Sequence, residues 1–89
     1  MAVNIAGQFA ERLRQARTQT GLSQSQLASR AGVSHSEIYR LEAGTREPRL
    51  GTVSELARGL GLDIGDLVAG LGRDANGTGP EALTYRKVD

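Results

Sequence analysis

The sequence predicts an all-α fold, a bundle of five short helices followed by a flexible C-terminal tail. Apolar residues recur at three- and four-residue spacing over most of the chain, which is the pattern of helices with one buried face. Only 3% of the residues are aromatic, so the core must be built from Leu, Ile, Val and Ala, which suit packed helices. Glycines and capping residues divide the apolar segments into short lengths.

The first helix is predicted over residues 4–20. Its apolar positions have the spacing of a one-sided helix, and they are Ala6, Phe9, Ala10, Leu13 and Ala16. Gly21 follows the last polar turn and supplies the left-handed conformation in which many helices end.

The next two helices are predicted from a repeated six-residue pattern, LSQSQL at 22–27 and VSHSEI at 33–38. In a capping box, a Ser side chain accepts from the amide three residues ahead, and a Gln or Glu side chain there returns the contact. An apolar residue on each side forms a staple. The expected boxes are Ser23 with Gln26 and Ser34 with Glu37, and the staples are Leu22 with Leu27 and Val33 with Ile38. Helices over 24–31 and 35–43 follow, with only residues 32–34 between them.

The fourth helix is predicted from five apolar positions before Gly61, which are Leu50, Val53, Leu56, Ala57 and Leu60. Gly51 and Gly59 each lower its helix propensity by about 1 kcal/mol against Ala, so packing must hold it. A weaker capping pattern, LDIGDL, starts the fifth helix, with Asp63 as cap, Asp66 as box partner and Leu62 facing Leu67.

The composition changes after Leu71, so the predicted domain covers 4–71 and a Gly-rich linker and tail cover 72–89. Residues 72–80 are typical of a flexible linker. Residues 81–89 are too short and too mixed to assign. They are either disordered or form a strand or helix that orders in an oligomer.

The composition also limits the function. The chain has no Cys and one His, no nucleophile paired with a base and no Gly-rich phosphate loop, so we expect no enzyme, no metal site and no cofactor. No apolar run approaches a membrane span and the N-terminus lacks signal-peptide features, so we expect a cytoplasmic, nucleoid-associated protein. The net charge is only +1, but every basic residue except Lys87 is Arg. This bias reflects either GC-rich coding or a preference for phosphates and guanine edges.

Two helices joined by a three-residue turn containing Gly form a helix-turn-helix. Its second helix is expected to turn Ile38 and Leu41 toward the core. The residues expected to face outward are His35, Ser36, Tyr39 and Arg40. A rigid, projecting helix of this kind fits the major groove of B-DNA.

Residues 7–70 resemble the Cro/C1-type (XRE family) helix-turn-helix domain of phage repressors and bacterial regulators. The resemblance rests on L-S-Q-x-x-L-A at 22–28, the small Ala31 before the turn, I-x-x-L-E-x-G at 38–44 and R-x-P at 46–48, all in order and spacing. It implies a λ-repressor-like five-helix bundle that binds double-stranded DNA. Such domains usually act as homodimers on a palindromic operator, and repression is the simpler outcome because it needs no further contacts.

The resemblance also implies roles for single residues. His35, Ser36 and Arg40 match base-reading positions, and an Arg can bind guanine O6 and N7 together. In another fold, Arg40 would be taken for a solvated surface residue. Tyr39 either packs on the sugar-phosphate or a thymine methyl, or covers the edge of the bundle.

Further matching positions concern the DNA backbone and the fold. Expected phosphate contacts come from Gln24, Ser34, Thr45 and Arg46, although Arg46 is equally read as a solvated loop charge. Arg17 and Glu42 match a partly buried salt bridge between the first and third helices. Arg49 departs from the family, because relatives often have a Ser or Thr cap there.

An alternative function is an antitoxin-like or partner-dependent interaction module, with DNA binding secondary and a protein partner held by the C-terminal tail. For the homodimer, two interfaces stay open: the tail as a dimerisation strand or arm, and the fourth and fifth helices, which dimers of the family often use. Leu67, Val68 and Leu71 are the residues expected to supply the apolar contacts of these helices.

Overall fold

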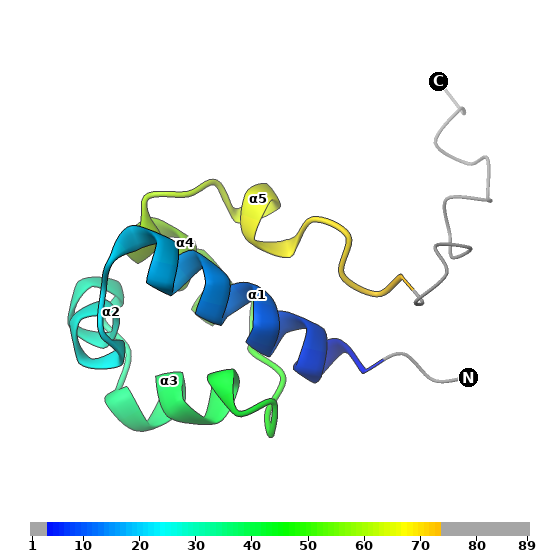
Figure 1. Cartoon of the computed structure of the whole chain (residues 1–89), viewed down its shortest axis with the longest axis horizontal. Helices are drawn as coiled ribbons and strands as arrows, with labels where there is room; N and C mark the ends of the chain where they lie inside the picture. Colours follow the sequence, from blue (N-terminus) through cyan, green and yellow to red (C-terminus); the bar gives the residue numbers. More distant parts are fainter. Residues whose placement is uncertain (1–3, 74–89) are drawn as a thin grey trace.

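The computed structural model describes residues 4–73, and in this range it contains only helices. The all-α prediction and the order of its elements are confirmed (Figure 1). The tail at 81–89 and all but the first two residues of the predicted linker lie outside the described residues. The helices are α1 (Ile5–Thr20), α2 (Gln24–Ala31), α3 (His35–Glu42), α4 (Leu50–Leu60) and α5 (Ile64–Val68).

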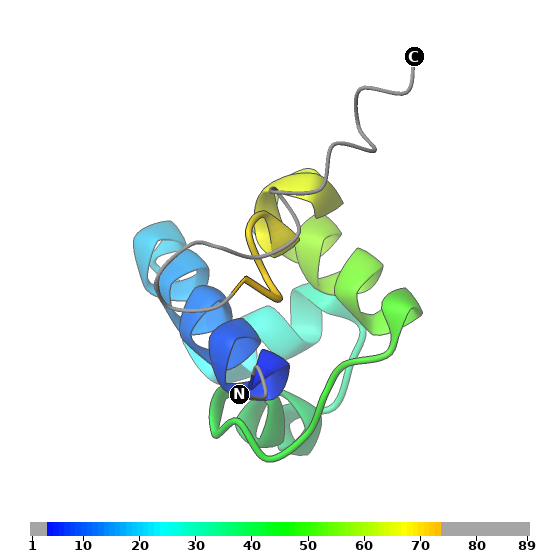
Figure 2. The same cartoon turned by 90° about the vertical axis from the view of Figure 1, so that its right-hand side faces the viewer.

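The helices pack so that α3 lies along one edge of the bundle. It contacts α1 and α2, while α2 also packs on α4, and α5 covers α4 and α1. Figures 1 and 2, two views at right angles, both show α3 at the lower edge with no helix beneath it. The outer face of α3 is therefore left uncovered by the rest of the described chain.

A single core of aliphatic side chains and one Phe joins all five helices. Its largest fully buried members are Phe9, Leu13, Leu27, Ile38, Leu41, Leu56 and Leu67. The staple residues Leu22 and Val33 pack against this core as predicted. Leu50 does not, because it sits in the first turn of α4 and is 77% exposed. Leu50 therefore marks the start of α4, as its position in the apolar pattern predicts, but it is not part of the core.

Gly59 allows α2 and α4 to approach closely. A Cβ at this buried position would lie 3.1 Å from the backbone N and Cβ of Ala31 and 3.2 Å from its Cα. The low helix propensity of Gly59 is thus the cost of a close contact between two backbones. Gly51 has no such role, since a Cβ there would meet nothing within 4 Å.

The capping box that starts α2 is complete. Ser23 Oγ accepts from the Gln26 amide at 3.0 Å, and Gln26 Oε1 accepts from the Ser23 amide at 2.8 Å. At α3 only the first half forms: Ser34 Oγ accepts from the Glu37 amide at 3.0 Å. The Glu37 carboxylate instead accepts from Arg46 at 2.7 Å, because a charged donor makes the stronger bond. The prediction of Glu37 as a box partner was wrong.

The ends of α5, α1 and α3 also differ from the prediction. Asp63 holds the N-cap position of α5 in an extended conformation, but its side chain makes no capping hydrogen bond. The Asp66 amide, which that side chain would cap, donates to the Asp63 carbonyl at 3.0 Å instead. Asn4, predicted inside the first helix, is its cap and accepts from the Gly7 amide at 2.9 Å. Helix α3 ends at Glu42, one residue earlier than predicted.

Candidate nucleic-acid interface

The helix-turn-helix is formed by α2, a three-residue turn and α3. Gly32 has φ of 72°, a left-handed conformation that glycine adopts without strain, and its amide donates to Ala28 O at 2.9 Å. Ser34 then caps α3 from an extended conformation. With Ile38 and Leu41 fully buried, the orientation of α3 about its own axis is fixed.

The opposite face of α3 carries the residues predicted to read bases, and the structure brings them together. His35, Ser36, Tyr39 and Arg40 are all exposed, Tyr39 by 64%. With Gln24 from the start of α2 they line a shallow hollow of about 440 Å³. This hollow therefore combines amide, imidazole, hydroxyl, phenol and guanidinium groups, which are the donors and acceptors that base edges and phosphates require.

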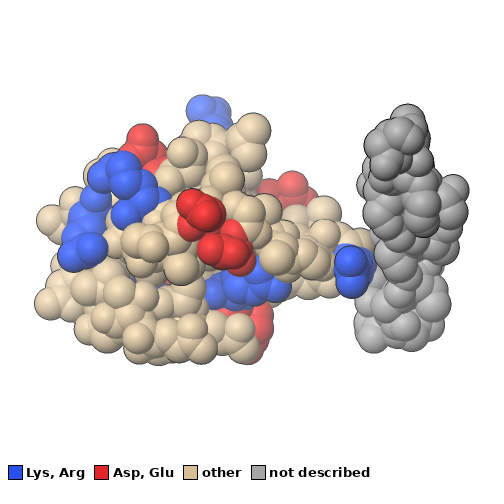
Figure 3. All heavy atoms as spheres, turned by 90° about the horizontal axis from the view of Figure 1, so that it is seen from above, with Lys and Arg blue, Asp and Glu red and all other residues tan. Residues whose placement is uncertain are grey.

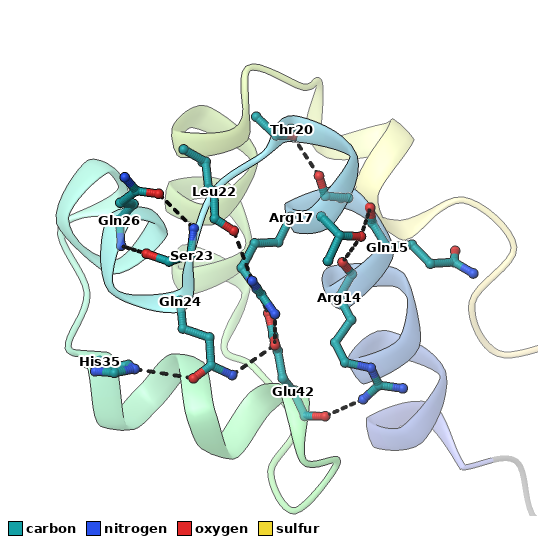
Figure 4. Close-up of polar contacts among 12 residues, drawn as sticks. Arg14, Gln15, Arg17, Thr20, Leu22, Ser23, Gln24, Gln26, His35 and Glu42 are labelled. Carbon is teal, nitrogen blue, oxygen red and sulfur yellow. Dashed lines mark hydrogen bonds and ion pairs between the residues drawn. The ribbon is translucent and has the colours of Figure 1, made fainter.

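A chain of polar contacts runs from the interior to this hollow (Figure 4). Arg17 donates from Nε and Nη2 to the two carboxylate oxygens of Glu42, at 2.6 and 2.9 Å. Gln24 Nε2 donates to Glu42 Oε1 at 3.0 Å, and Gln24 Oε1 lies 3.2 Å from Nε2 of His35. Figure 4 shows the Gln24 side chain between Glu42 and His35. One side chain of α2 thus connects the buried ion pair between α1 and α3 to the exposed face of α3.

The ion pair at the inner end of this chain holds α1 against α3. Glu42 is only 4% exposed, and the backbone carbonyl of the same residue accepts from Arg14 Nη1 at 2.6 Å. The hydrogen bond to Glu42 raises the pKa of Arg17, with Coulombic attraction acting in the same direction and burial opposing both. Arg17 therefore stays charged at every pH at which the protein is studied.

The remaining predicted phosphate contacts lie near the ends of α3. Ser34 is exposed at its start, and Thr45 is exposed beyond its end, where Thr45 Oγ1 donates to Arg40 O at 3.2 Å. Arg46 is not a free loop charge, since it pairs with Glu37 at 2.7 Å. Within residues 4–73, the guanidinium groups of Arg40 and Arg49 have neither a hydrogen-bond acceptor nor an ion-pair partner.

Sequence reasoning missed two features of this site. The contact between Gln24 and His35 joins positions eleven residues apart on different helices. Only the geometry of the turn brings them together, so no local pattern could have indicated it. A phosphate contact from Arg49 had no support from its position in the family pattern, yet its guanidinium is exposed and has no partner within residues 4–73, which makes it a candidate for such a contact.

Charges elsewhere on the domain are mixed. The face shown in Figure 3, which looks down on the α5 side, has acidic side chains interspersed with basic ones. Exposed pairs join Arg14 to Glu11 at 2.5 Å and Arg58 to Glu55. No continuous basic area covers this face.

The predicted dimer contacts are only partly available. Leu67 is fully buried in the core of its own chain, so its prediction as an interface residue was wrong. Val68 and Leu71 are half-buried against that core. The large apolar side chains that are exposed in this part of the chain are instead Leu50 on α4, Leu62 in the loop between α4 and α5, and Ile64 on α5.

The described part of the chain has no helix long and apolar enough to cross a bilayer. The same residues do not gather three or more His, Asp or Glu side chains in a way that would hold a metal ion.

Comparison with known proteins gives consistent matches. The model of a helix-turn-helix domain family matches residues 8–71. An uncharacterized HTH-type transcriptional regulator, y4dL, of Sinorhizobium fredii is 43% identical over 54 residues. The cryptic phage CTXphi transcriptional repressor RstR of Vibrio cholerae is 34% identical over 61 residues. Among solved structures, the restriction-modification controller protein C.AhdI of Aeromonas hydrophila superimposes with a TM-score of 0.68 at 35% identity.

These matches differ in how much of each protein they cover. The match to y4dL spans 61% of this chain and 28% of that protein, and the match to RstR spans 68% and 55%. C.AhdI is matched over 70% of this chain and 94% of its own. The similarity thus covers the helical domain, and the curated relatives extend well beyond the part they share with it.

Proposed function

This chain belongs to the helix-turn-helix family of Cro/C1 (XRE) type, and we propose that it is a transcriptional regulator that binds double-stranded DNA in a sequence-specific way. The observation that carries the proposal is the outer face of α3. That face is uncovered, it is fixed in orientation by the core, and its Arg40 guanidinium has no acceptor within the described residues. An unpaired guanidinium on a projecting helix is suited to the O6 and N7 atoms of guanine.

In the proposed mechanism, a homodimer places two copies of α3 in successive major grooves, about 34 Å apart, on a palindromic operator. Arg40, Ser36 and His35 read bases, with Tyr39 beside them on the same face. Occupation of the operator then blocks transcription without catalysis or a cofactor. The relative RstR is a transcriptional repressor, which supports this outcome.

Phosphate contacts set the position of α3 in the groove. Gln24 lies at the start of α2, where the free amides and the helix dipole favour an anion. Ser34, Thr45 and Arg46 lie at the two ends of α3, where the DNA backbone would pass. For Arg46, a phosphate competes with the half-buried Glu37 carboxylate to which it now donates.

The homodimer is proposed to use the surface where α4 meets α5. Leu62 and Ile64 are exposed there, beside the half-buried Val68 and Leu71. Burial of these side chains in a second copy would remove apolar area from water, at about 25 cal/mol for each Å².

Selection of bound sites from a random duplex pool, at near-physiological salt, tests the function. The wild type should select a palindrome, and Arg40→Ala should lose the preference at one symmetric position, because guanine discrimination of about 1–3 kcal/mol is removed. Gln24→Ala should weaken binding on every sequence, because a phosphate contact at the start of α2 is lost. Arg58→Ala is the control, since Arg58 lies on α4, paired with Glu55 and outside the hollow.

Two outcomes would count against the proposal. If Arg40→Ala changed neither affinity nor preference, α3 would not be the reading helix. If the folded wild type enriched no sequence at all, the partner-dependent alternative would gain, and a bound protein should then be sought.

A further inference from the structure

We infer that the buried carboxylate of Glu42 is a positioning residue for base recognition. It fixes which way the Gln24 amide points and, through Gln24, which ring nitrogen of His35 carries the hydrogen. The inference rests on the proposed function for its consequence on DNA, but its first step concerns the free protein alone. On this inference, the buried Glu42 contributes to base specificity although it makes no contact with a base.

The direction of the chain of hydrogen bonds is set at its inner end. An Arg side chain can only donate and an ionised carboxylate can only accept. Arg17 donates from Nε and Nη2 to both oxygens of Glu42, and its third nitrogen, Nη1, donates to Leu22 O at 2.9 Å. The carboxylate, 4% exposed and held by this charged partner, therefore has only acceptor capacity to offer to Gln24.

Gln24 transmits this direction to the surface. A side-chain amide has a donor end and an acceptor end, and only the donor end can face a carboxylate. The Gln24 NH₂ group lies 3.0 Å from Glu42 Oε1, so the amide oxygen must point the other way, toward His35. Reversing the amide would set two acceptors against each other in a partly buried site, which costs a hydrogen bond and adds repulsion.

The orientation of the Gln24 amide in turn determines the tautomer of His35. Its Nε2 lies 3.2 Å from the Gln24 oxygen, so this nitrogen must carry the hydrogen. In the neutral ring the other nitrogen, Nδ1, is then an acceptor on an exposed side chain that lines the hollow. An acceptor complements the amino groups of adenine and cytosine in the major groove and rejects guanine, which presents only acceptors there.

Nitrogen NMR of the free protein at about pH 8, where an ordinary His is neutral, tests the tautomer. In the wild type, Nε2 should show the shift of a protonated nitrogen and Nδ1 that of a bare one. In Gln24→Ala the ring should relax to a mixture, with a measurable population protonated on Nδ1. A wild-type ring protonated on Nδ1, or identical spectra for the two proteins, would overturn the inference without reference to DNA.

Glu42→Gln tests the role of the carboxylate itself. A carboxamide can donate to Gln24, so the amide can reverse and the Nδ1-protonated form of His35 should increase. Glu37→Gln is the matched control, because Glu37 is on the same helix but pairs with Arg46 and makes no hydrogen bond with Gln24 or His35. It should leave the His35 spectrum unchanged. Should Glu42→Gln fail to fold, the Gln24→Ala spectrum still decides.

Site selection then measures the consequence on DNA. The operator position that His35 reads is the one where His35→Ala loses its preference. At that position the wild type should select adenine or cytosine. In Glu42→Gln the discrimination against guanine there should fall at least about fivefold, the lower end of what one base contact provides. Selection of guanine at that position by the wild type would refute the inference. Absence of any selected sequence would instead refute the proposed function and leave the tautomer result standing.

Discussion

Replacing Gly59 with Ala tests how tightly α2 and α4 must pack. The new Cβ would lie 3.1 Å from the N and Cβ of Ala31, so the two helices must move apart by a few tenths of an ångström. Overpacking of this kind costs about 1–3 kcal/mol, while the gain in helix propensity is at most about 1 kcal/mol. With the full gain in propensity, we expect a net loss of up to about 2 kcal/mol in the free energy of unfolding.

Thermal and urea unfolding followed by circular dichroism would measure this loss. Each kcal/mol corresponds to about 4–8 °C in Tm for a domain of this size. Gly51→Ala is the control, because the same change on the same helix meets nothing within 4 Å and should stabilise by roughly 0.4–1 kcal/mol. If Gly59→Ala proved as stable as Gly51→Ala, the close approach of α2 and α4 would not limit the packing, and the argument would fail.

Three further predictions concern caps and charges. Ser23→Ala should lower the free energy of unfolding by about 1 kcal/mol because it removes a complete capping box, whereas Asp63→Ala should change it by less than about 0.5 kcal/mol because no side-chain cap is lost; equal losses in urea titrations would contradict this. Arg17→Met should lower the free energy of unfolding by about 3–5 kcal/mol, because it leaves Glu42 buried and without its ion-pair partner. Adding Glu42→Leu should restore much of that stability. A double variant no more stable than Arg17→Met in the same titrations would show that the isolated charge is not the cause. Arg46→Ala should barely affect stability, as its ion pair is exposed, but should reduce the slope of log Kd against log salt by about one; an unchanged slope in fluorescence titrations would remove Arg46 from the phosphate contacts.

Much of the fold could be predicted because its signals are local. The boxes and glycines around α2 lie within a few residues of one another, so the sequence places both helix ends correctly. Prediction failed where a local preference met a competing partner. Glu37 has the right spacing for a box, but Arg46, nine residues away, offers a charged donor.

The sequence could predict which residues form the candidate site but not which hydrogen bonds join them. The outward positions of α3 follow from helical spacing once Ile38 and Leu41 are taken as core. The contacts of Gln24 with both Glu42 and His35 depend on how three helices meet. Sequence spacing contains no information about such distances between elements.

By itself, the sequence determined that residues 4–73 form five helices, where most of them begin and end, and which face of α3 is polar. These properties depend on caps, glycines and periodicity, which act within about one turn of helix. Only the tertiary structure decided that Leu67 is core, that Gly59 is needed for contact with Ala31, and that Glu42 reaches the exposed face through Gln24. Hydrogen bonds and packing between helices require atoms within about 4 Å, and only the folded chain brings them there.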